Sequence, residues 1–457
     1  MMTESQRAAL AEYAAVKGQC PARERLAALF DDGVYTETGS NLRAGENLAG
    51  VVTAYGYIGG TPAYAFSQDS TVMKGAVSLA HSAKICKMFE LAARNGVPVV
   101  GIYDSCGAFV EDGADALNAY SDILLSMGSL SGVVPMVSVI SGVCAGTMAM
   151  IASSADFSVI TEGAELYLDA SGNNASAESA AKSGAVSAYA KSDAEAMDTV
   201  RRYLSLMPQN NLSPLPEFEF DAPVSAAFDN AENAAESIAD AGSILEVYGE
   251  YGTASYTALC TVSGVTAGIA ATNKTKDKLT SADCSKIARF VRLCDAYSIP
   301  VITVADTEGF DLHGADMVRA GAALAGAYAE ASCAKIALVS GKACGMAYIA
   351  FAGRNVAADA VYALPEAVIA PMDPVSAAEF LYHDRLKSAD DLTAARNEIA
   401  KEYAENEGSA FAAAAKGAAD EVVTAENVRA AVASVLDVTA GKRLNKRLPK
   451  KHNILPL

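Results

Sequence analysis

An internal repeat constrains the fold of this chain more than any other feature of its sequence. Residues 83–107 read AKICKMFELAARNGVPVVGIYDSCG, and residues 285–309 read SKIARFVRLCDAYSIPVITVADTEG. At one constant offset, Lys84 matches Lys286, Pro98 matches Pro300, Asp104 matches Asp306 and Gly107 matches Gly309. Because self-similarity at a long period marks a duplicated unit, the repeat predicts two copies of one domain rather than two unrelated domains.

Each copy of the repeat predicts the same succession of helices and strands. The spacing of apolar residues indicates an amphipathic helix, a turn with proline, and then a buried strand that ends at aspartate and a glycine-bearing loop. Two strand-like segments precede the helix, and a further strand with a glycine-rich turn and a helix follows. Helices that pack on such a sheet make an α/β domain. The matched segments are residues 28–38 with 238–248, 50–55 with 257–262, 63–67 with 267–271, 99–103 with 301–305, and 136–140 with 335–339.

The length of the chain is consistent with this duplication. At about 100–200 residues per domain, 457 residues predict two domains, each large enough to bury its own core. We place the domains at residues 1–220 and 221–457, because the polar, proline-rich stretch Pro208–Val224 is typical of a linker. Asp169–Ser183, rich in Ser, Ala, Asn and Gly, predicts a flexible or surface insertion in the first domain.

Composition excludes several classes of function. The formal net charge of −19 argues against nucleic acid as a partner, because affinity for a phosphate backbone comes from Lys and Arg. Four histidines and the lack of clustered ligand motifs predict no metal site. The nine cysteines include no CxxC pair and mostly lie in apolar runs, which indicates free thiols and a cytoplasmic location.

One uncharged stretch raises the question of a membrane span. No charged residue lies between Asp122 and Asp156, which is long enough to cross a bilayer. Pro135 and Gly142 divide the stretch into a loop, a short strand and a turn, so we predict a buried strand–turn–helix instead. The N-terminus has no charged segment followed by an apolar core, and therefore predicts no secretory signal.

The two glycine-rich turns, Ser141–Gly146 and Ser340–Gly345, are candidate anion or oxyanion sites. Each follows an apolar strand and opens a helix, where backbone N–H groups are unpaired and point at whatever occupies the turn. Glycine also lets a ligand approach the backbone closely. Such turns also serve only to pack a helix on a strand, but their matched positions in two repeats favour a function.

Four side chains near these turns could act as acids or bases. Asp104 and Asp306 end matched strands, where a carboxylate either transfers protons or simply forms the turn. The turn-forming interpretation is the more common one. His81 and His313 lie near loops and could move protons, although neither has an evident partner in the sequence.

Two cysteines and the basic C-terminal segment complete the candidates. Cys106 and Cys144 lie in glycine-rich turns where a thiolate could be nucleophilic, but no positioned base is visible, which favours packing thiols. Lys442–Lys451 holds six Lys or Arg and could bind acidic partners, or be a solvated or subunit-docking tail. The sequence contains no Ser–His–Asp arrangement, no Walker A motif and no GxGxxG after a strand.

At these residues the chain resembles the carboxyltransferase subunits of biotin-dependent acyl-CoA carboxylases, such as propionyl-CoA carboxylase β. It is equally similar to the α subunits of sodium-pumping acyl-CoA decarboxylases. The likeness covers nearly the whole chain, and the motifs occur in the same order. The matching segments are Arg23–Leu26, Phe66–Asp69, Lys84–Lys87, Asp104–Ser105, Ser131–Pro135, Cys144–Gly146, Ala288–Arg292, Cys294–Ala296, Ile299–Pro300, Ala327–Ala331, Lys342–Gly345 and Lys450–Ile454.

The resemblance implies a fold of two crotonase-like domains, each a ββα-superhelix of the ClpP/crotonase superfamily. It also implies that the first domain binds acyl-CoA and that the second domain of a partner subunit binds biotin. Carboxyl transfer then passes through an enolate held by backbone oxyanion holes, which need no side-chain base. By the same resemblance, the thioester hole is formed by Gly146 and Thr147, and the biotin hole by Met346 and Ala347.

Further residues are implied to line the substrate site. Gly107 and Ala108 lie in the loop after the first-domain strand, and Ile349 occupies the position that lines the acyl pocket. An apolar residue at that position fits a short acyl chain. The phosphates of coenzyme A need a local basic patch on a chain of charge −19, and our candidates for it are Lys74, Lys84 and Lys87.

The implied cofactor and partners lie on other chains. No Met-Lys-Met biotin-attachment sequence is present, so biotin is expected on a separate biotin carboxyl carrier protein. The other partners are a biotin carboxylase or a membrane decarboxylase subunit, and a site shared between subunits implies a homo-oligomer, a dimer or a hexamer. The substrate is a coenzyme A thioester, and no metal is predicted in this subunit.

Several departures from the family leave alternatives open. Thr147 and Met346 each stand where family members usually carry the second glycine of a Gly-Gly pair, Phe109 replaces an Arg, and Asp373-Pro374 replaces a Gly. These changes favour, as an alternative, a non-catalytic CoA-binding paralogue. A sodium-pumping decarboxylase that runs the transfer in reverse is a second alternative, and a crotonase-type hydratase or isomerase, with Glu111 as its carboxylate, is a third.

Overall fold

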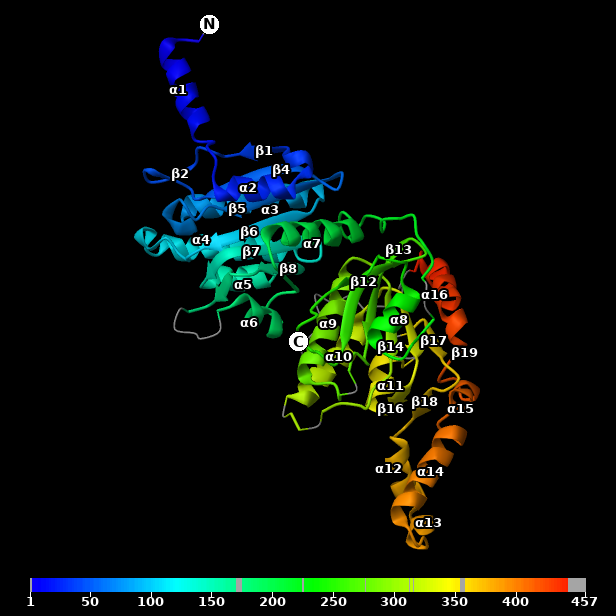
Figure 1. Ribbon diagram of the computed structural model, residues 1–457. Helices are drawn as coiled ribbons and strands as arrows, with labels where there is room; N and C mark the ends of the chain where they lie inside the picture. The colour runs from blue at the N-terminus through cyan, green and yellow to red at the C-terminus, as the bar shows by residue number, and fades with distance from the viewer. Residues whose placement is uncertain are drawn as a thin grey trace. The chain divides into compact units, whose positions relative to one another are not determined.

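The computed structural model describes residues 2–169, 175–223, 226–275, 277–311, 313–314, 316–353 and 358–442. Contacts between residues divide the chain into two compact units, Met1–Pro214 and Leu215–Leu457 (Figure 1). The division lies inside the proline-rich stretch 208–224. Within the predicted insertion 169–183, the helix α6 (Ala177–Lys182) is described. Of the basic tail 442–451, only Lys442 is among the described residues.

The first unit is built on an eight-stranded sheet in the order β1-β4-β5-β6-β7-β8-β10, with β9 paired to β7. The pairs β1–β4 and β4–β5 are antiparallel, and every pair from β5 onward is parallel. The strands are β1 (Tyr35–Thr38), β4 (Val51–Ile58), β5 (Thr61–Gln68), β6 (Val99–Ser105), β7 (Met136–Ala145), β8 (Phe157–Thr161), β9 (Glu165–Tyr167) and β10 (Ala188–Ala190). A two-stranded antiparallel ribbon, β2 (Arg43–Ala44) with β3 (Asn47–Leu48), comes between β1 and β4 in the sequence.

The helices of the first unit follow from local signals. In α3, Ser78 caps the N-terminus by accepting from the His81 N–H at 3.2 Å, and Gly96 ends the helix with φ 61°. All seven residues of β6 are buried, as expected for a central strand of a parallel sheet. The helices are α1 (Glu4–Ala15), α2 (Pro21–Leu29), α3 (Leu79–Asn95), α4 (Asp115–Leu130), α5 (Thr147–Ser153), α6 and α7 (Asp193–Leu206).

The second unit repeats this sheet. Its strand order is β11-β12-β13-β14-β15-β17-β19, again with two antiparallel pairs followed by parallel ones. The strands are β11 (Leu245–Glu246), β12 (Tyr256–Val262), β13 (Val265–Ala271), β14 (Val301–Ala305), β15 (Lys335–Val339), β17 (Ala360–Ala363) and β19 (Glu421–Val422). A separate ribbon pairs β16 (Lys342–Cys344) with β18 (Val368–Ala370). The α/β class predicted from the repeat is confirmed.

The helices of the second unit include a projection that the first unit lacks among its described residues. Figure 1 shows α12, α13 and α14 extending from this unit. These helices have a small core of their own, made by Ala378, Leu386, Ile399 and Ala400. The helices of the unit are α8 (Ala231–Ile238), α9 (Ser281–Ala296), α10 (Met317–Glu330), α11 (Met346–Phe351), α12 (Pro374–Leu381), α13 (His383–Lys387), α14 (Leu392–Asn406), α15 (Ala410–Ala415) and α16 (Ala425–Thr439). No described helix is both long and apolar enough to cross a membrane.

Candidate functional site

Two equivalent turns follow the carboxyl end of β7 in the first unit and, by way of the short strand β16, that of β15 in the second. In the first unit, β7 leads to Gly146 with φ 66° and ψ −140°, and α5 begins at Thr147. In the second, β16 leads to Gly345 with φ 54° and ψ −122°, and α11 begins at Met346. A positive φ favours glycine, which explains why each turn keeps one glycine at this place. Ligands of open α/β sheets bind outside the carboxyl ends of their strands.

The hydrogen bonds of the turns correct one predicted donor. The Gly146 N–H donates to the Tyr167 carbonyl at 2.9 Å, and the Gly345 N–H donates to the Ala370 carbonyl at 2.9 Å. Gly146 is therefore not a free donor, because β9 already uses its N–H. The sequence pattern did not predict this contact, because the acceptor Tyr167 belongs to β9, a strand that lies further along the chain.

The free donors are the first amides of each helix. An α-helix has no internal acceptor for its first N–H groups. Within the described residues, no acceptor takes the N–H groups of Thr147 and Met148, or those of Met346 and Ala347. The two pairs occupy matching positions after Gly146 and Gly345. Three of the four predicted donors, Thr147, Met346 and Ala347, thus have N–H groups that no described residue accepts.

The loop after β6 lies next to the first turn. Ser105 of β6 pairs with Cys144 of β7, so the segments that follow both strands run side by side. Val77 holds this loop with two backbone hydrogen bonds. Its N–H donates to the Gly107 carbonyl at 2.9 Å, and its carbonyl accepts from the Phe109 N–H at 3.0 Å. The N–H of Ala108 has no acceptor within the described residues. Gly107 and Ala108 therefore lie near this turn, and their contact with a substrate stays a prediction.

Asp104 and Asp306 brace the turns. A Cβ built on Gly142 would lie 2.3 Å from Asp104 Oδ1, and one on Gly341 would lie 2.2 Å from Asp306 Oδ1. Both carboxylates are thus packed directly against a glycine backbone. The turn-forming interpretation of these aspartates is the one that the contacts support.

The partners of the two aspartates differ between the units. Arg25 donates to Asp104 Oδ2 at 2.9 Å and to the Ser141 carbonyl at 2.9 Å, and Ser70 also donates to Asp104 Oδ2. Asp306 accepts from the Lys342 N–H at 2.8 Å and from Asn273 Nδ2 at 3.2 Å. Sequence reasoning did not single out Arg25, although it lies within the quoted motif Arg23–Leu26.

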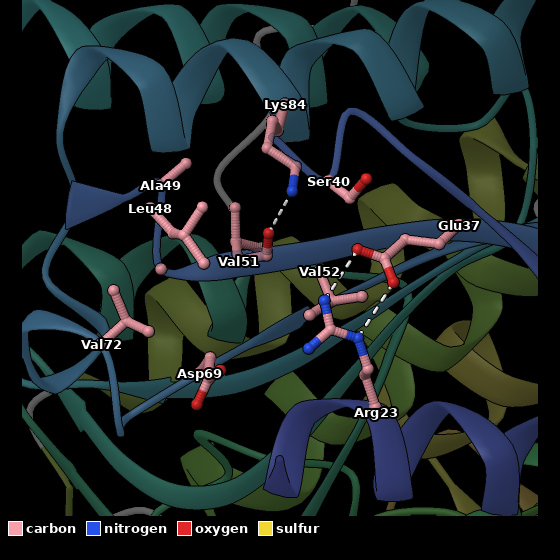
Figure 2. Close-up of a pocket in the computed structure, with 11 residues that line it drawn as sticks. Arg23, Glu37, Ser40, Leu48, Ala49, Val51, Val52, Asp69, Val72 and Lys84 are labelled. Atoms are coloured by element: carbon pink, nitrogen blue, oxygen red, sulfur yellow. Dashed lines mark hydrogen bonds and ion pairs between the residues drawn. The ribbon is translucent and has the colours of Figure 1, made fainter. Parts of the chain in front are cut away.

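The repeated lysines are structural, which corrects the prediction for Lys84. Figure 2 shows Lys84 Nζ donating to the Val51 carbonyl, and the side chain is buried. Lys286 likewise donates to the carbonyls of Ser255 at 2.9 Å and Gly252 at 3.3 Å. Burial lowers the pKa of each lysine to about 8. Lys84 is therefore not available to coenzyme A phosphates.

Lys74 and Lys87 are exposed and stay candidates for phosphate contact. The Lys74 carbonyl accepts from the Cys106 N–H at 3.1 Å, so Lys74 lies beside the loop that carries Gly107. No contact of Lys87 with that loop is among the described hydrogen bonds. The basic patch is thus smaller than predicted, and Lys74 is the member nearest the turn.

A small pocket in the first unit is not a substrate site. It lies between α2, β4 and α3, where Arg23 makes a two-bond ion pair with Glu37 at 3.0 Å in each bond (Figure 2). Its volume of about 20 Å³ has room for little more than a water molecule. Lys84 closes one wall and Asp69 lies on another. A coenzyme A thioester does not fit there.

The remaining histidine and cysteine candidates do not form a catalytic group. Gln68 accepts from the Asp104 N–H through Oε1, so its amide nitrogen donates to His81 Nε2 at 3.2 Å. Burial lowers the pKa of His81 to about 3 and raises that of Cys144 well above its usual value. His313 and Cys106 are exposed. None of these four has a described hydrogen bond to another candidate acid or base.

Exposed apolar side chains flank both helix starts. Ile349 is 53% exposed one turn after the 46% exposed Met346 on α11, and Met150 is 52% exposed on α5. Single exposed apolar side chains are common on protein surfaces, so these three are available for contact with a ligand without indicating one by themselves. No group of three His, Cys, Asp or Glu among the described residues could hold a metal ion.

The fold and its turns define an α/β protein of two repeated units, each with a pair of free backbone donors at the carboxyl edge of its sheet. Residues 14–455 match the family model of the carboxyl transferase domain. The chain belongs to this carboxyl transferase family. The predicted family and the prediction that the chain is an enzyme, a carboxyltransferase, are confirmed.

Named relatives align over almost the full chain. The α subunit of methylmalonyl-CoA decarboxylase from Propionigenium modestum is 33% identical, covering 96% of this chain and 94% of its own. The 12S subunit of methylmalonyl-CoA carboxyltransferase from Propionibacterium freudenreichii subsp. shermanii is 33% identical over 96% and 92%. The propionyl-CoA carboxylase β chain of Roseobacter denitrificans is 32% identical over 96% and 94%. A crystal structure of transcarboxylase 12S, solved as a hexamer with hydrolysed methylmalonyl-coenzyme A, superposes with a TM-score of 0.90 at 31% identity, covering all of both chains.

Proposed function

We propose that this chain moves a carboxyl group between biotin, carried by a separate protein, and a short-chain acyl-CoA such as propionyl- or methylmalonyl-CoA. The observation that carries the proposal is the matched pair of free amides in each unit, Thr147–Met148 and Met346–Ala347. The names of the aligned relatives support the acyl-CoA substrate class. We also propose that each unit is a crotonase-like domain.

The donor pairs suit the chemistry of an enolate. Removing the carboxyl group or the α-proton of an acyl-CoA places negative charge on the thioester oxygen. Fixed N–H groups aimed at that oxygen stabilise the charge without reorganising, which is the largest single contribution in many enzymes. Thr147 and Met148 would hold the thioester oxygen, with Gly107 and Ala108 beside them.

The second turn would hold the ureido oxygen of biotin. Met346 and Ala347 offer two backbone donors, and the ureido carbonyl oxygen has two lone pairs that can accept them, so the residues present fit the group. Biotin, when bound, supplies or accepts the carboxyl group. No side-chain acid or base in this chain is required, which agrees with the structural roles of Asp104 and Asp306. Ile349 would limit the length of the acyl chain.

The shared site proposed from the family's organisation requires at least a dimer. The first unit of one subunit would bind acyl-CoA and the second unit of its partner would bind biotin. The biotin carboxyl carrier protein, and either a biotin carboxylase or a membrane decarboxylase subunit, would be the other partners. The transcarboxylase 12S relative is described as a hexamer and a multienzyme core, which supports an oligomer.

The direction of transfer has two candidates. The Propionigenium modestum relative is a decarboxylase subunit, which favours transfer from methylmalonyl-CoA to biotin. The Roseobacter relative is a carboxylase subunit, which favours the reverse. Purified protein should be incubated with malonyl- or methylmalonyl-CoA and free biotin, and the loss of the carboxyl group from CoA assayed. No transfer with any short acyl-CoA at high enzyme concentration would refute the proposal.

A further inference from the structure

Lys342 contacts two segments of the second unit, the loop 306–308 and Asp373, directly before the turn that contains Met346 and Ala347. Its Nζ donates to Asp373 Oδ2 at 2.9 Å and also to Glu308 Oε2. Its backbone N–H donates to Asp306 Oδ1 at 2.8 Å, and its carbonyl accepts from the Thr307 N–H at 2.8 Å. Side chain and backbone together fix the first residue of β16.

β16 connects Lys342 to the turn at Gly345, which we call the second donor turn because the free amides of Met346 and Ala347 follow it. Lys342 pairs with Val368 and Cys344 with Ala370 in the ribbon β16–β18, and Gly345 then donates to the Ala370 carbonyl. Only three residues separate Lys342 from Met346, where α11 begins. A shift of Lys342 would therefore move the two free amides, and the geometry of preorganised donors tolerates little displacement.

The same lysine connects the turn to the helical projection. Asp373 is the N-cap of α12, since its Oδ1 accepts from the Val375 N–H at 2.9 Å while its Oδ2 accepts from Lys342. α12 packs on α14 within the projection (Figure 1). One carboxylate thus joins the start of the projection to the strand that leads into the turn.

This arrangement is particular to the second unit of this chain. The match of Gly142 with Gly341 places Val143 at the position of Lys342 in the first unit, where no ion pair is possible. The contact with Asp373 needs its carboxylate, so a glycine at this position would remove it. Burial acts to lower the pKa of Lys342, but Glu308 and Asp373 outweigh it and the pKa is raised. Lys342 in turn lowers the pKa of Asp373, so the Lys342–Asp373 pair is charged near neutral pH.

We propose that Lys342 is a positioning residue for the second donor turn, and that its bridge to Glu308 and Asp373 couples that turn to α12. The pairs are partly exposed, with 23% of the Lys342 side chain and 39% of that of Asp373 accessible, so their contribution to overall stability is small. Their consequence is local geometry. The kinetic part of this inference rests on the proposed function, because it assigns the second turn to biotin.

The kinetic test compares Lys342→Met, Lys342→Arg and Lys335→Met in the full-length chain. Lys335 is the control lysine of the same unit, because it begins β15, away from the turn, and its buried side chain donates to the Tyr328 carbonyl at 2.7 Å and the Ala331 carbonyl at 2.8 Å. We expect K342M to lower kcat/KM for biotin about tenfold or more, the scale of a lost charge-assisted hydrogen bond, with KM for acyl-CoA unchanged. K342R should retain much of the wild-type kcat/KM for biotin, because arginine keeps the positive charge. If Lys342 only stabilised the fold, K342M would lower the fraction of active enzyme and so reduce kcat/KM for biotin and for acyl-CoA equally. We expect that equal reduction for K335M.

Hydrogen exchange provides a readout that does not depend on activity. The amides of residues 343–350 should exchange faster in K342M and in Asp373→Gly, and near the wild-type rate in K342R and K335M. Unchanged exchange in K342M and D373G would overturn the positioning role whatever the kinetics. If the wild type transfers no carboxyl group, the proposed function fails, while the exchange experiment still decides the inference about Lys342.

Discussion

Gly142 and Gly341 show how single residues set the geometry of the two turns. Each lacks a Cβ, which would lie little more than 2 Å from the neighbouring aspartate carboxylate. That carboxylate accepts hydrogen bonds from segments that are distant in the sequence. In the first unit the donors are Arg25 and Ser70, and in the second they are Asn273 and the Lys342 backbone. The aspartate–glycine contact is thus the common element, and its partners have diverged.

Gly142→Ala should lower the free energy of unfolding of the first unit by about 1–3 kcal/mol or more, because the new methyl group overlaps Asp104. Gly128→Ala is the matched control, since nothing lies within 4 Å of its Cβ on the exposed face of α4, and it should stabilise by about 0.5–1 kcal/mol. Urea unfolding followed by circular dichroism measures both. Equal effects of the two substitutions would contradict the packing of Asp104 against Gly142.

His81 should make the first unit sensitive to acid. Burial lowers its pKa from 6.5 to about 3, so the unfolded chain takes up the proton first as the pH falls. Its contribution to stability is complete above pH 6.5 and is lost between pH 6.5 and 3, which amounts to about 2 kcal/mol at pH 5. Unfolding curves at pH 7.5 and pH 5 should show this difference.

The control for His81 is the exposed His313. His81→Gln should remove most of the extra loss between pH 7.5 and pH 5, whereas His313→Gln should leave it unchanged. An H81Q variant with the same acid sensitivity as the wild type would show that other groups cause it.

The elements themselves followed largely from local pattern. The strand predicted at 301–305 coincides with β14, and those at 63–67 and 267–271 lie within β5 and β13. The turns were harder to predict, because β7 continues to Ala145 as one strand whereas the second unit divides the same segment into β15 and β16. In each unit the residues before the turn pair with a later strand, β9 or β18, and a local sequence pattern does not show such pairing. The engagement of the Gly146 N–H and the burial of Lys84 depend on similar non-local contacts.

The first position of α5 permits a direct test of the backbone donors. Proline is tolerated at the first residue of a helix, where its missing N–H has no helical acceptor. Thr147→Pro therefore removes a proposed oxyanion donor while keeping the helix, and kcat should fall about 10²–10³-fold. Thr147→Ala keeps the N–H and is the control, with activity close to that of the wild type. Carboxyl transfer from methylmalonyl-CoA measures kcat, and the melting temperature should change little in either variant.

Glycine at the two departures from the family tests the non-catalytic alternative. If the native chain is active, Thr147→Gly and Met346→Gly should retain transfer within about tenfold of the wild type, since both keep the backbone donors. The assay is the same carboxyl transfer with free biotin. Activity that appears only in the double glycine variant would show that the native chain binds coenzyme A without turnover.

At the scale of the whole molecule, the duplication explains a chain with few catalytic side chains. His81 is buried, His313 is exposed, and Asp104 and Asp306 have structural roles, so the free amides at the starts of α5 and α11 remain as the repeated chemical feature of the described residues. Two equivalent donor pairs suit two oxyanions, one on each substrate. A single unit would have only one pair, so the reaction that we propose needs both units.

Mixing two inactive variants tests whether one site draws its donor pairs from different subunits. In a dimer of T147P with Met346→Pro, one site combines both defects, while the other combines the intact first unit of one subunit with the intact second unit of its partner. Random exchange makes about half of the dimers mixed, so about a quarter of wild-type activity should return. Variants purified separately, then unfolded, mixed and refolded, provide the measurement, and each variant refolded alone is the control. No recovery, in a mixture that mass spectrometry shows to contain mixed dimers, would place both donor pairs of a site in one chain.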